Sequence, residues 1–109
     1  MKAIKYLLLI LLFAPAVYAG EKKTDTVLIK TSAICSECKE RIETALAYEK
    51  GIVKSDVNFK TGVVSVIYKT DKTNPVAIRK AISEAGYDAD NVKANSKAYT
   101  KLPKCCKKQ

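Results

Sequence analysis

The order of sequence patterns predicts an α+β fold of the ferredoxin-like type, with two helices packed on one face of a four-stranded antiparallel sheet. Two amphipathic helical segments alternate with short β-rich segments in the order β-α-β-β-α-β. A very short turn joins the second and third β-rich segments, which is typical of a hairpin. Neither an internal repeat nor a low-complexity segment interrupts this order.

The first predicted strand and helix surround a pair of cysteines. Hydrophobic and polar residues alternate over residues 26–32, which predicts the first strand. A helix is predicted over residues 36–48, because Ile42 and Leu46 recur at helical spacing. Glutamates crowd the first half of this helix, where the helix dipole favours acidic side chains. Gly51 offers a stop, since glycine adopts the left-handed cap conformation.

A hairpin and a second helix follow. The hairpin strands are predicted over residues 52–59 and 63–69, around a turn that contains Gly62. One face of the first hairpin strand is expected to hold Val53, Ser55, Val57 and Phe59. Asn74 and Pro75 open the second helix as an N-cap residue followed by proline at the first helical position. Its apolar residues have the clearest helical periodicity in the chain: Ile78, Ala81, Ile82 and Ala85.

The signal weakens towards the C-terminus. Residues 91–94 are predicted to form the fourth strand, and residues 96–102 a helical turn before a proline. We divide the chain into a signal peptide, a domain over residues 20–95 and a basic tail over residues 96–109 that carries two adjacent cysteines. The last six residues are expected to be mobile.

The N-terminal residues 1–19 have the order of a secretory signal peptide: a lysine-containing start, an apolar run and small residues at a cleavage site after Ala19. An uncleaved anchor is the alternative, but the run over residues 6–14 is shorter than the roughly 20 residues that span a bilayer. The pattern therefore predicts a periplasmic or secreted protein that has no stable membrane insertion after cleavage.

The chain is basic, with a formal net charge of +9. The lysines are spread along the whole sequence, and the one dense basic stretch spans residues 104–108. Such a distribution is typical of a solvated surface, with a weak attraction to an anionic membrane or an acidic partner as the alternative. Nucleic acid is not expected as a partner, because export separates the protein from it.

The chemistry of the chain is expected to lie in its four cysteines, which occur as Cys35-x-x-Cys38 and as the adjacent pair Cys105 and Cys106. A disulfide that closes so short a loop gains little from chain entropy. Pairing between the two clusters remains open, since sequence does not determine connectivity. The chain contains no histidine, so neither a zinc-enzyme ligand set nor a Cys-His catalytic pair is present, and an enzyme is not expected.

Three interpretations of Cys35 and Cys38 compete. They are metal ligands, a redox pair of a small thiol–disulfide oxidoreductase, or a closed disulfide in a plain interaction module. The placement between a strand and a helix favours metal binding, because a helix N-terminus lowers thiol pKa values and soft thiolates select ions such as Cu(I) and Zn(II). Two thiolates on a surface loop leave coordination open, which suits transfer of the ion to a partner.

The segments TSAICSECKERIETAL, residues 31–46, and AIRKAISEAGYDA, residues 77–89, resemble the heavy-metal-associated domain. This family includes copper chaperones, N-terminal modules of metal-pumping P-type ATPases and the periplasmic mercury-binding protein. The resemblance covers about residues 26–94 and implies the same β-α-β-β-α-β fold. It also implies that Cys35 and Cys38 bind the metal. Cu(I) is favoured over Hg(II), Zn(II) or Cd(II), and a membrane metal transporter or thiol-rich acceptor is the expected partner.

Two features of the loops bear on this resemblance. The family loop reads Gly-Met-Thr before the first cysteine, whereas this chain reads Ser32-Ala33-Ile34, so Ala33 or Ile34 is expected to take over the packing of the methionine. The resemblance also implies that Tyr87, which follows Gly86, shields the metal.

Cys105 and Cys106 are unusual for the minimal family. Flanking lysines are expected to favour their thiolate forms. The predicted fourth strand would end at the pole away from Cys35, so the tail would have to fold back to reach the site. Our hypothesis is that Cys105 and Cys106 add a third or fourth thiolate, either to the same ion or in the site of a second chain. The protein is expected to be a monomer or a metal-bridged dimer. A separate metal site, a disulfide and a mobile tail are the alternatives.

Overall fold

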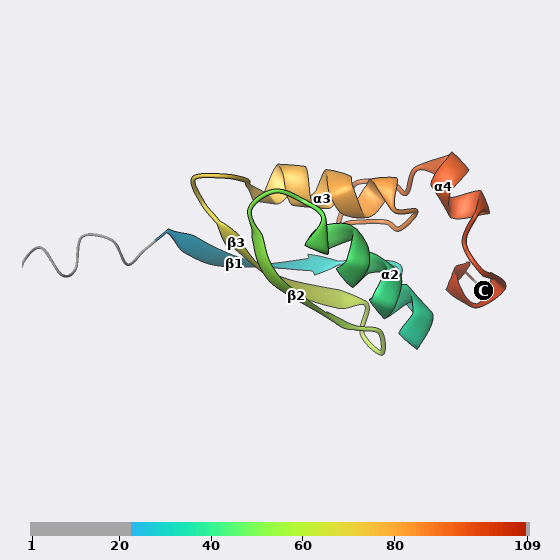
Figure 1. Cartoon of the computed structure of the whole chain (residues 1–109). Helices are drawn as coiled ribbons and strands as arrows, with labels where there is room; N and C mark the ends of the chain where they lie inside the picture. Colours follow the sequence, from blue (N-terminus) through green and yellow to red (C-terminus); the bar gives the residue numbers. More distant parts are fainter. Residues whose placement is uncertain (1–22, 109) are drawn as a thin grey trace, which may run out of the picture.

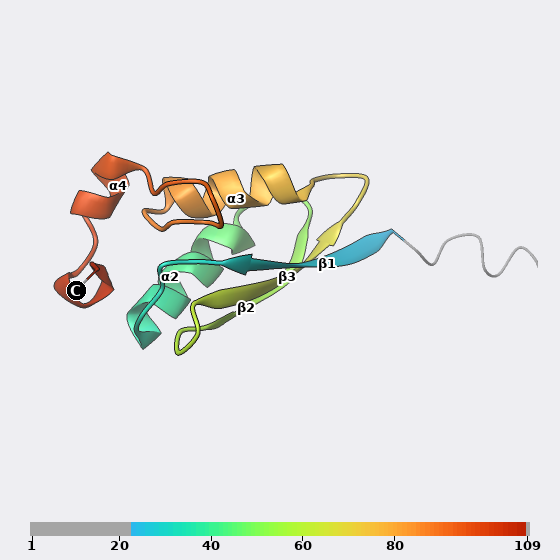
Figure 2. The ribbon, with the colours of Figure 1, turned by 180° about the vertical axis from the view of Figure 1, so that it is seen from behind.

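The computed structural model describes residues 23–108, and the predicted signal peptide lies outside them. The elements are β1 Thr24–Lys30, α2 Ser36–Ala47, β2 Ile52–Asn58, β3 Val63–Lys69, α3 Pro75–Glu84, α4 Ser96–Thr100 and the 3₁₀-helix η1 Lys104–Cys106. Helices α2 and α3 cover one side of the sheet, as both views of the ribbon show (Figures 1 and 2). No helix among residues 23–108 is long and apolar enough to cross a membrane.

The described sheet has three antiparallel strands in the order β1-β3-β2. The predicted hairpin of β2 and β3 is confirmed. Its register shifts between Ile52 and Lys54, which marks a bulge in β2. A bulge turns the following side chains to the opposite face. Val53 is therefore 52% exposed, and its predicted place beside the buried Val57 is wrong.

The core lies between the sheet and the two long helices. Its fully buried side chains include Ile29, Val64 and Val66 from the strands, and Ile42, Leu46, Ile78 and Ile82 from the helices. The helical spacing of the apolar residues is confirmed on both helices. The Asn74 side chain caps α3 by accepting a hydrogen bond from the Ala77 N–H at 2.9 Å, as its sequence position predicts.

The predicted fourth strand over residues 91–94 is wrong. Within the described range, Ala89 forms only isolated bridges to Thr31 and Val92. Asp90, whose φ is 52°, turns the chain at this point. Its N–H donates to the Lys30 carbonyl at 2.8 Å and its carboxylate accepts the Lys30 N–H at 2.9 Å. A turn and a side chain thus take the place of a strand beside the end of β1.

The end of α3 binds the segment that would have formed this strand. The Ser83 hydroxyl donates to the Lys93 carbonyl at 2.7 Å, and the Ser83 carbonyl accepts the Asn95 N–H at 2.9 Å. The Ala94 N–H donates to the Asp88 carboxylate at 2.9 Å. These backbone groups are therefore satisfied without a sheet partner, and the chain is directed towards α4.

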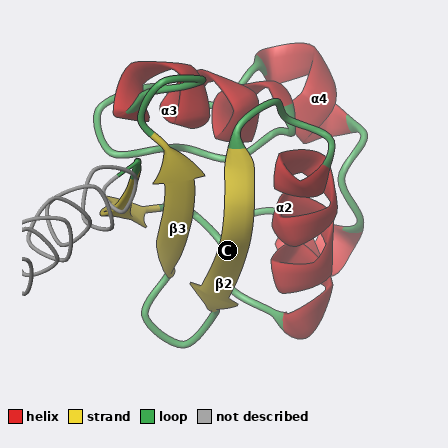
Figure 3. Cartoon of the chain, turned by 60° about the vertical axis from the view of Figure 1, so that its left-hand side comes forward, coloured by secondary structure: helices red, strands yellow, loops and turns green. Residues whose placement is uncertain are grey.

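The C-terminal tail packs on the domain. The predicted helical turn is present as α4, which lies beside the end of α3 (Figure 3). Gly86 has a φ of 105°, and a Cβ there would stand 3.1 Å from the carbonyl carbon of Ala98. Leu102 and Cys106 are buried, with exposures of 6% and 1%. The expectation that the last six residues are mobile is therefore wrong for residues 104–108, because an apolar anchor and a buried cysteine hold them.

We predict that Asp90→Ala lowers the free energy of unfolding by about 1–2 kcal/mol at neutral pH, since it removes the acceptor for the Lys30 N–H. A hydrogen bond from Arg79 holds the pKa of the Asp90 carboxyl below its usual range. The contribution should therefore be complete above about pH 4 and disappear as the pH falls further. Urea unfolding at several pH values measures it. Asp71→Ala, at an exposed position, is the control.

Candidate metal-binding site

Cys35 occupies the N-cap position of α2, with its backbone extended. Its carbonyl accepts the Lys39 N–H at 3.2 Å, so the helix begins at this residue. The preceding loop is held by Thr31, whose hydroxyl donates to the Gly62 carbonyl at 2.6 Å and accepts the Ala33 N–H at 3.1 Å. The end of β1, the hairpin turn and the start of α2 thus fix one another. A sulfur at this position lies where the helix dipole favours negative charge.

Of the two residues expected to replace the buried family methionine, Ala33 is the one that packs in the core. Its exposure is 3%, whereas Ile34 is 43% exposed. The loop therefore directs the smaller side chain into the core and leaves the isoleucine at the surface.

The structure brings all four cysteines together. The Cys35 sulfur lies 3.2 Å from that of Cys38, 3.3 Å from that of Cys105 and 3.5 Å from that of Cys106. The two tail sulfurs are 4.0 Å apart. All four are free thiols. The tail folds back to the site, as our hypothesis required of a chain whose predicted fourth strand would have ended at the opposite pole. Cys35 is the sulfur that approaches each of the other three.

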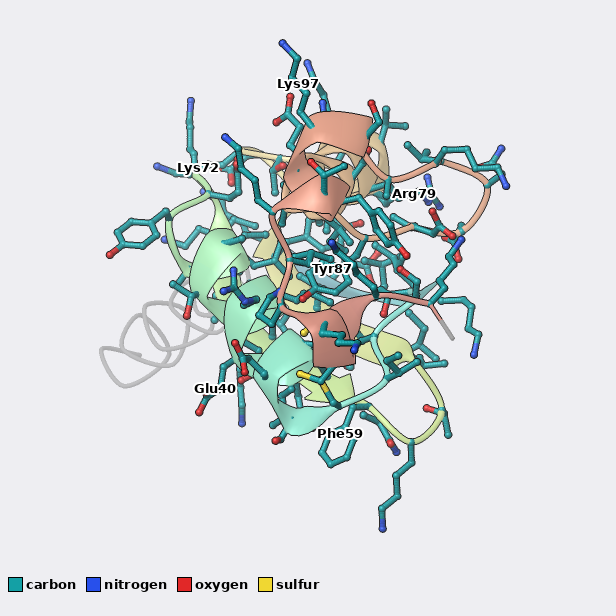
Figure 4. The ribbon with its side chains drawn as sticks, turned by 90° about the vertical axis from the view of Figure 1, so that its right-hand side faces the viewer. Glu40, Phe59, Lys72, Arg79, Tyr87 and Lys97 are labelled. Atoms are coloured by element: carbon teal, nitrogen blue, oxygen red, sulfur yellow. The ribbon has the colours of Figure 1, made fainter. Side chains whose placement is uncertain are left out.

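One side of the cluster is buried and the other is open. Cys38 and Cys106 are almost wholly buried, Cys35 is half-buried and Cys105 is exposed. Figure 4 looks onto this end of the molecule, with Tyr87 close to the sulfur atoms that lie between α2 and η1. An incoming ion or partner can therefore approach from the side of Cys35 and Cys105.

Tyr87 covers the buried side. It is fully buried, and its hydroxyl makes no well-formed hydrogen bond within the described residues. Burial first, and then the neighbouring thiols of Cys106 and Cys38, raise the pKa of this phenol. Tyr87 thus stays a neutral group beside the sulfurs, in the position that the family resemblance implies for a shielding aromatic residue.

The thiols of Cys35, Cys105 and Cys106 differ in acidity. Burial disfavours the Cys35 thiolate, but hydrogen bonds with the Cys38 backbone and with the thiols of Cys38, Cys105 and Cys106 outweigh it and lower its pKa to about 7. The hydrogen bond with Cys35 raises the pKa of the Cys105 thiol, and burial raises the pKa of the Cys106 thiol. Of these three thiols, Cys35 is therefore the one that carries the first negative charge.

The expected effect of the tail lysines on the two tail thiols is not found. The Lys108 ammonium lies 2.6 Å from the Asp88 carboxylate, so its positive charge is paired with Asp88 rather than with a tail thiolate. The Cys105 sulfur has an acidic neighbour instead, Glu37, at 3.9 Å. Both tail thiols have raised pKa values, Cys105 first through its hydrogen bond with Cys35 and Cys106 first through burial. The acidic neighbours Asp88 and Glu37 could not have been identified from the sequence, since no local pattern links them to the tail.

The sequence model of one protein family, the heavy-metal-associated domain, matches residues 24–88. These residues span the sheet, both long helices and the Cys35-x-x-Cys38 loop. The chain belongs to the heavy-metal-associated domain family. The match ends at Asp88, so α4, η1 and the two tail cysteines lie beyond the part of the chain that the family describes.

Relatives of known name share this domain. The copper chaperone CopZ of Staphylococcus saprophyticus subsp. saprophyticus is 34% identical over 65 residues, which are 60% of this chain and 94% of that protein. Oxidised MerP from Ralstonia metallidurans CH34 has a crystal structure that is 31% identical, with a TM-score of 0.59 over 62% of this chain and 94% of its own. The soluble region of the P-type ATPase CopA from Bacillus subtilis is also 31% identical, with a TM-score of 0.56 over 61% of this chain and 44% of its own.

We predict that alkylation of the reduced, metal-free protein begins at Cys35. Its rate should rise with pH around a midpoint of about 7, because only the thiolate is nucleophilic. Cys105 is more exposed but should react only at higher pH, since its pKa is raised. Mass spectrometry of peptides after a short iodoacetamide pulse at each pH measures both. In urea-unfolded protein the difference should vanish; a Cys105 that reacts first in the folded protein would contradict the assignment.

Proposed function

We propose that this protein is an exported carrier that captures a soft metal ion, Cu(I) in preference to Hg(II), Zn(II) or Cd(II), on the thiolates of Cys35 and Cys38. The observation that carries the proposal is the pair of free thiols 3.2 Å apart at the N-terminus of α2. The lowered pKa of Cys35 supplies a thiolate near neutral pH. Soft thiolates select soft ions of this kind.

Several features support a carrier rather than an enzyme. The named relatives include a copper chaperone, and the cysteine cluster is open to solvent on the side of the exposed Cys105. An open side allows a partner thiolate to reach the ion and replace the protein ligands. The cysteines have no histidine beside them, so no general base is available for thiol catalysis of the Cys-His kind.

The acceptor we propose is a membrane metal transporter or another thiol-rich protein. The fold that this chain shares with the soluble region of the P-type ATPase CopA supports this choice, because two domains of one fold can present similar thiolate pairs to a single ion. Export to the periplasm or beyond the cell is proposed from the signal-peptide pattern of residues 1–19 alone.

Anaerobic titration of the reduced protein with Cu(I), against a chromophoric competing chelator, tests the proposal. Cys35→Ser/Cys38→Ser should weaken Cu(I) binding by at least about a thousandfold, because each thiolate ligand contributes several kcal/mol. Ser36→Ala, an exposed position between the two cysteines, is the matched control and should bind as the parent does.

Two results would contradict the proposal. One is an unchanged Cu(I) affinity in Cys35→Ser/Cys38→Ser, once circular dichroism has shown that the variant is folded. The other is turnover of a disulfide substrate with a dithiol reductant by a protein that holds no stable metal complex, which would favour the oxidoreductase.

A further inference from the structure

We infer that Cys105 and Cys106 complete a metal centre around Cys35, so that the docked tail supplies ligands that the family domain lacks; this rests on the proposed metal-binding function. The sulfurs of Cys35, Cys105 and Cys106 all lie within 4.8 Å of one another. Cys38, whose sulfur is 3.2 Å from that of Cys35, stands next to this set. The ligands of one ion would thus come from the start of α2 and from η1.

The spacing of the sulfurs suits a single ion. For a metal–sulfur bond of about 2.3 Å, three thiolates in a plane stand about 4.0 Å apart, and four at tetrahedral corners about 3.8 Å apart. The tail sulfurs are already 4.0 Å apart. The distances of 3.3 Å and 3.5 Å from Cys35 need to widen by less than about 1 Å, which side-chain rotation supplies.

The tail reaches the site because it packs against defined residues of the domain. The backbone of α4 lies against Gly86, where an added Cβ would stand only 3.1 Å from the Ala98 backbone. Leu102 belongs to the same buried cluster as Tyr87, and Cys106 is buried in it as well. A tail that only happened to lie near the cysteines would not place an apolar anchor and a thiol in the core of the domain.

Polar contacts close the far end of the tail. Lys108 forms an ion pair with Asp88 at 2.6 Å, and its backbone N–H donates to the Tyr99 hydroxyl at 2.9 Å. Asp88 is itself fixed to the cysteine loop, since its N–H donates to the Ser32 hydroxyl at 2.9 Å. Leu102 lies just before η1 and Lys108 just after it, and both are attached to the domain. Cys105 and Cys106 are held between these two attachments.

A centre with three or more thiolates has a different metal preference from a pair. Zn(II) and its heavier relative Cd(II) favour four ligands, whereas Cu(I) is satisfied by two or three. The tail should therefore strengthen the binding of Cd(II) more than that of Cu(I). Because the tail covers part of the site, η1 also has to detach from the domain before thiolates of a partner can replace all of the protein ligands of the ion.

Cd(II) is the probe for the test, with the full mature chain reduced and handled without oxygen. The parent should bind one Cd(II) per chain. Cys105→Ser/Cys106→Ser should still bind one ion, but at least about a hundredfold more weakly, with a smaller thiolate-to-metal charge-transfer absorbance. For Cu(I) the loss should be less than about tenfold. Native mass spectrometry counts the ions and chains in each complex.

Leu102→Ala separates the position of the tail from its sulfurs. This change removes the buried anchor and leaves all four cysteines in place, so Cd(II) affinity should fall at least about tenfold towards that of Cys105→Ser/Cys106→Ser. Leu28→Ala, at a leucine that is 66% exposed, is the matched control and should bind as the parent does. Thermal unfolding of each metal-free variant establishes that the domain remains folded.

The outcomes distinguish the two proposals. If Cys105→Ser/Cys106→Ser binds Cd(II) as tightly as the parent while Cys35→Ser/Cys38→Ser does not, the shared centre is wrong and the carrier proposal stands. Two ions on the parent and one on the tail variant would reveal a separate tail site and overturn the shared centre as well. If Cys35→Ser/Cys38→Ser binds both metals like the parent, the carrier proposal itself fails.

Discussion

The position of the Cys35 sulfur at the N-cap of α2 is the constraint on which the site depends. Burial disfavours the thiolate of this sulfur, but hydrogen bonds with the Cys38 backbone and with the other three thiols outweigh burial and lower its pKa to about 7. The N-terminus of a helix is also a position where negative charge is favoured. The Thr31 hydroxyl and the Gly62 carbonyl fix the loop that carries it. All three remaining cysteines lie within 3.5 Å of this one sulfur, so both cysteine pairs meet there.

Elements with strong local patterns could be predicted from the sequence. The periodicity around Ile42 and Ile78 predicted both long helices, and the short turn at Gly62 predicted the hairpin. The bulge that exposes Val53 has no local signature, because it arises from the pairing with β3. The fourth strand was wrong for a similar reason. The Asp90 side chain binds Lys30 at the place that this strand would have filled, and the side chains of Ser83 and Asp88 bind the backbone of residues 91–94. No sequence periodicity indicates such contacts.

The site residues also fall into a pair that could be predicted from a local pattern and a pair that could not. The spacing of Cys35 and Cys38 before an amphipathic helix is a local pattern, so their proximity could be predicted. The approach of Cys105 and Cys106 to Cys35 depends on three contacts between residues far apart in the sequence. These are the packing of α4 against Gly86, the burial of Leu102 and the ion pair of Lys108 with Asp88. The ion pair with Asp88 also explains why the Lys108 charge does not act on the tail thiols as its sequence position suggested. A tail beyond the family domain thus completes a cluster that the family pattern only begins.

The Cd(II) affinities of the four single cysteine-to-serine variants, measured side by side without oxygen, test the central role of Cys35 most directly. If Cys35 joins both cysteine pairs in one centre, Cys35→Ser should cause the largest loss of the four, because its sulfur lies within 3.5 Å of each of the other three. A Cys35→Ser variant that loses no more affinity than Cys105→Ser, the change at the exposed tail sulfur, would contradict the central role of Cys35.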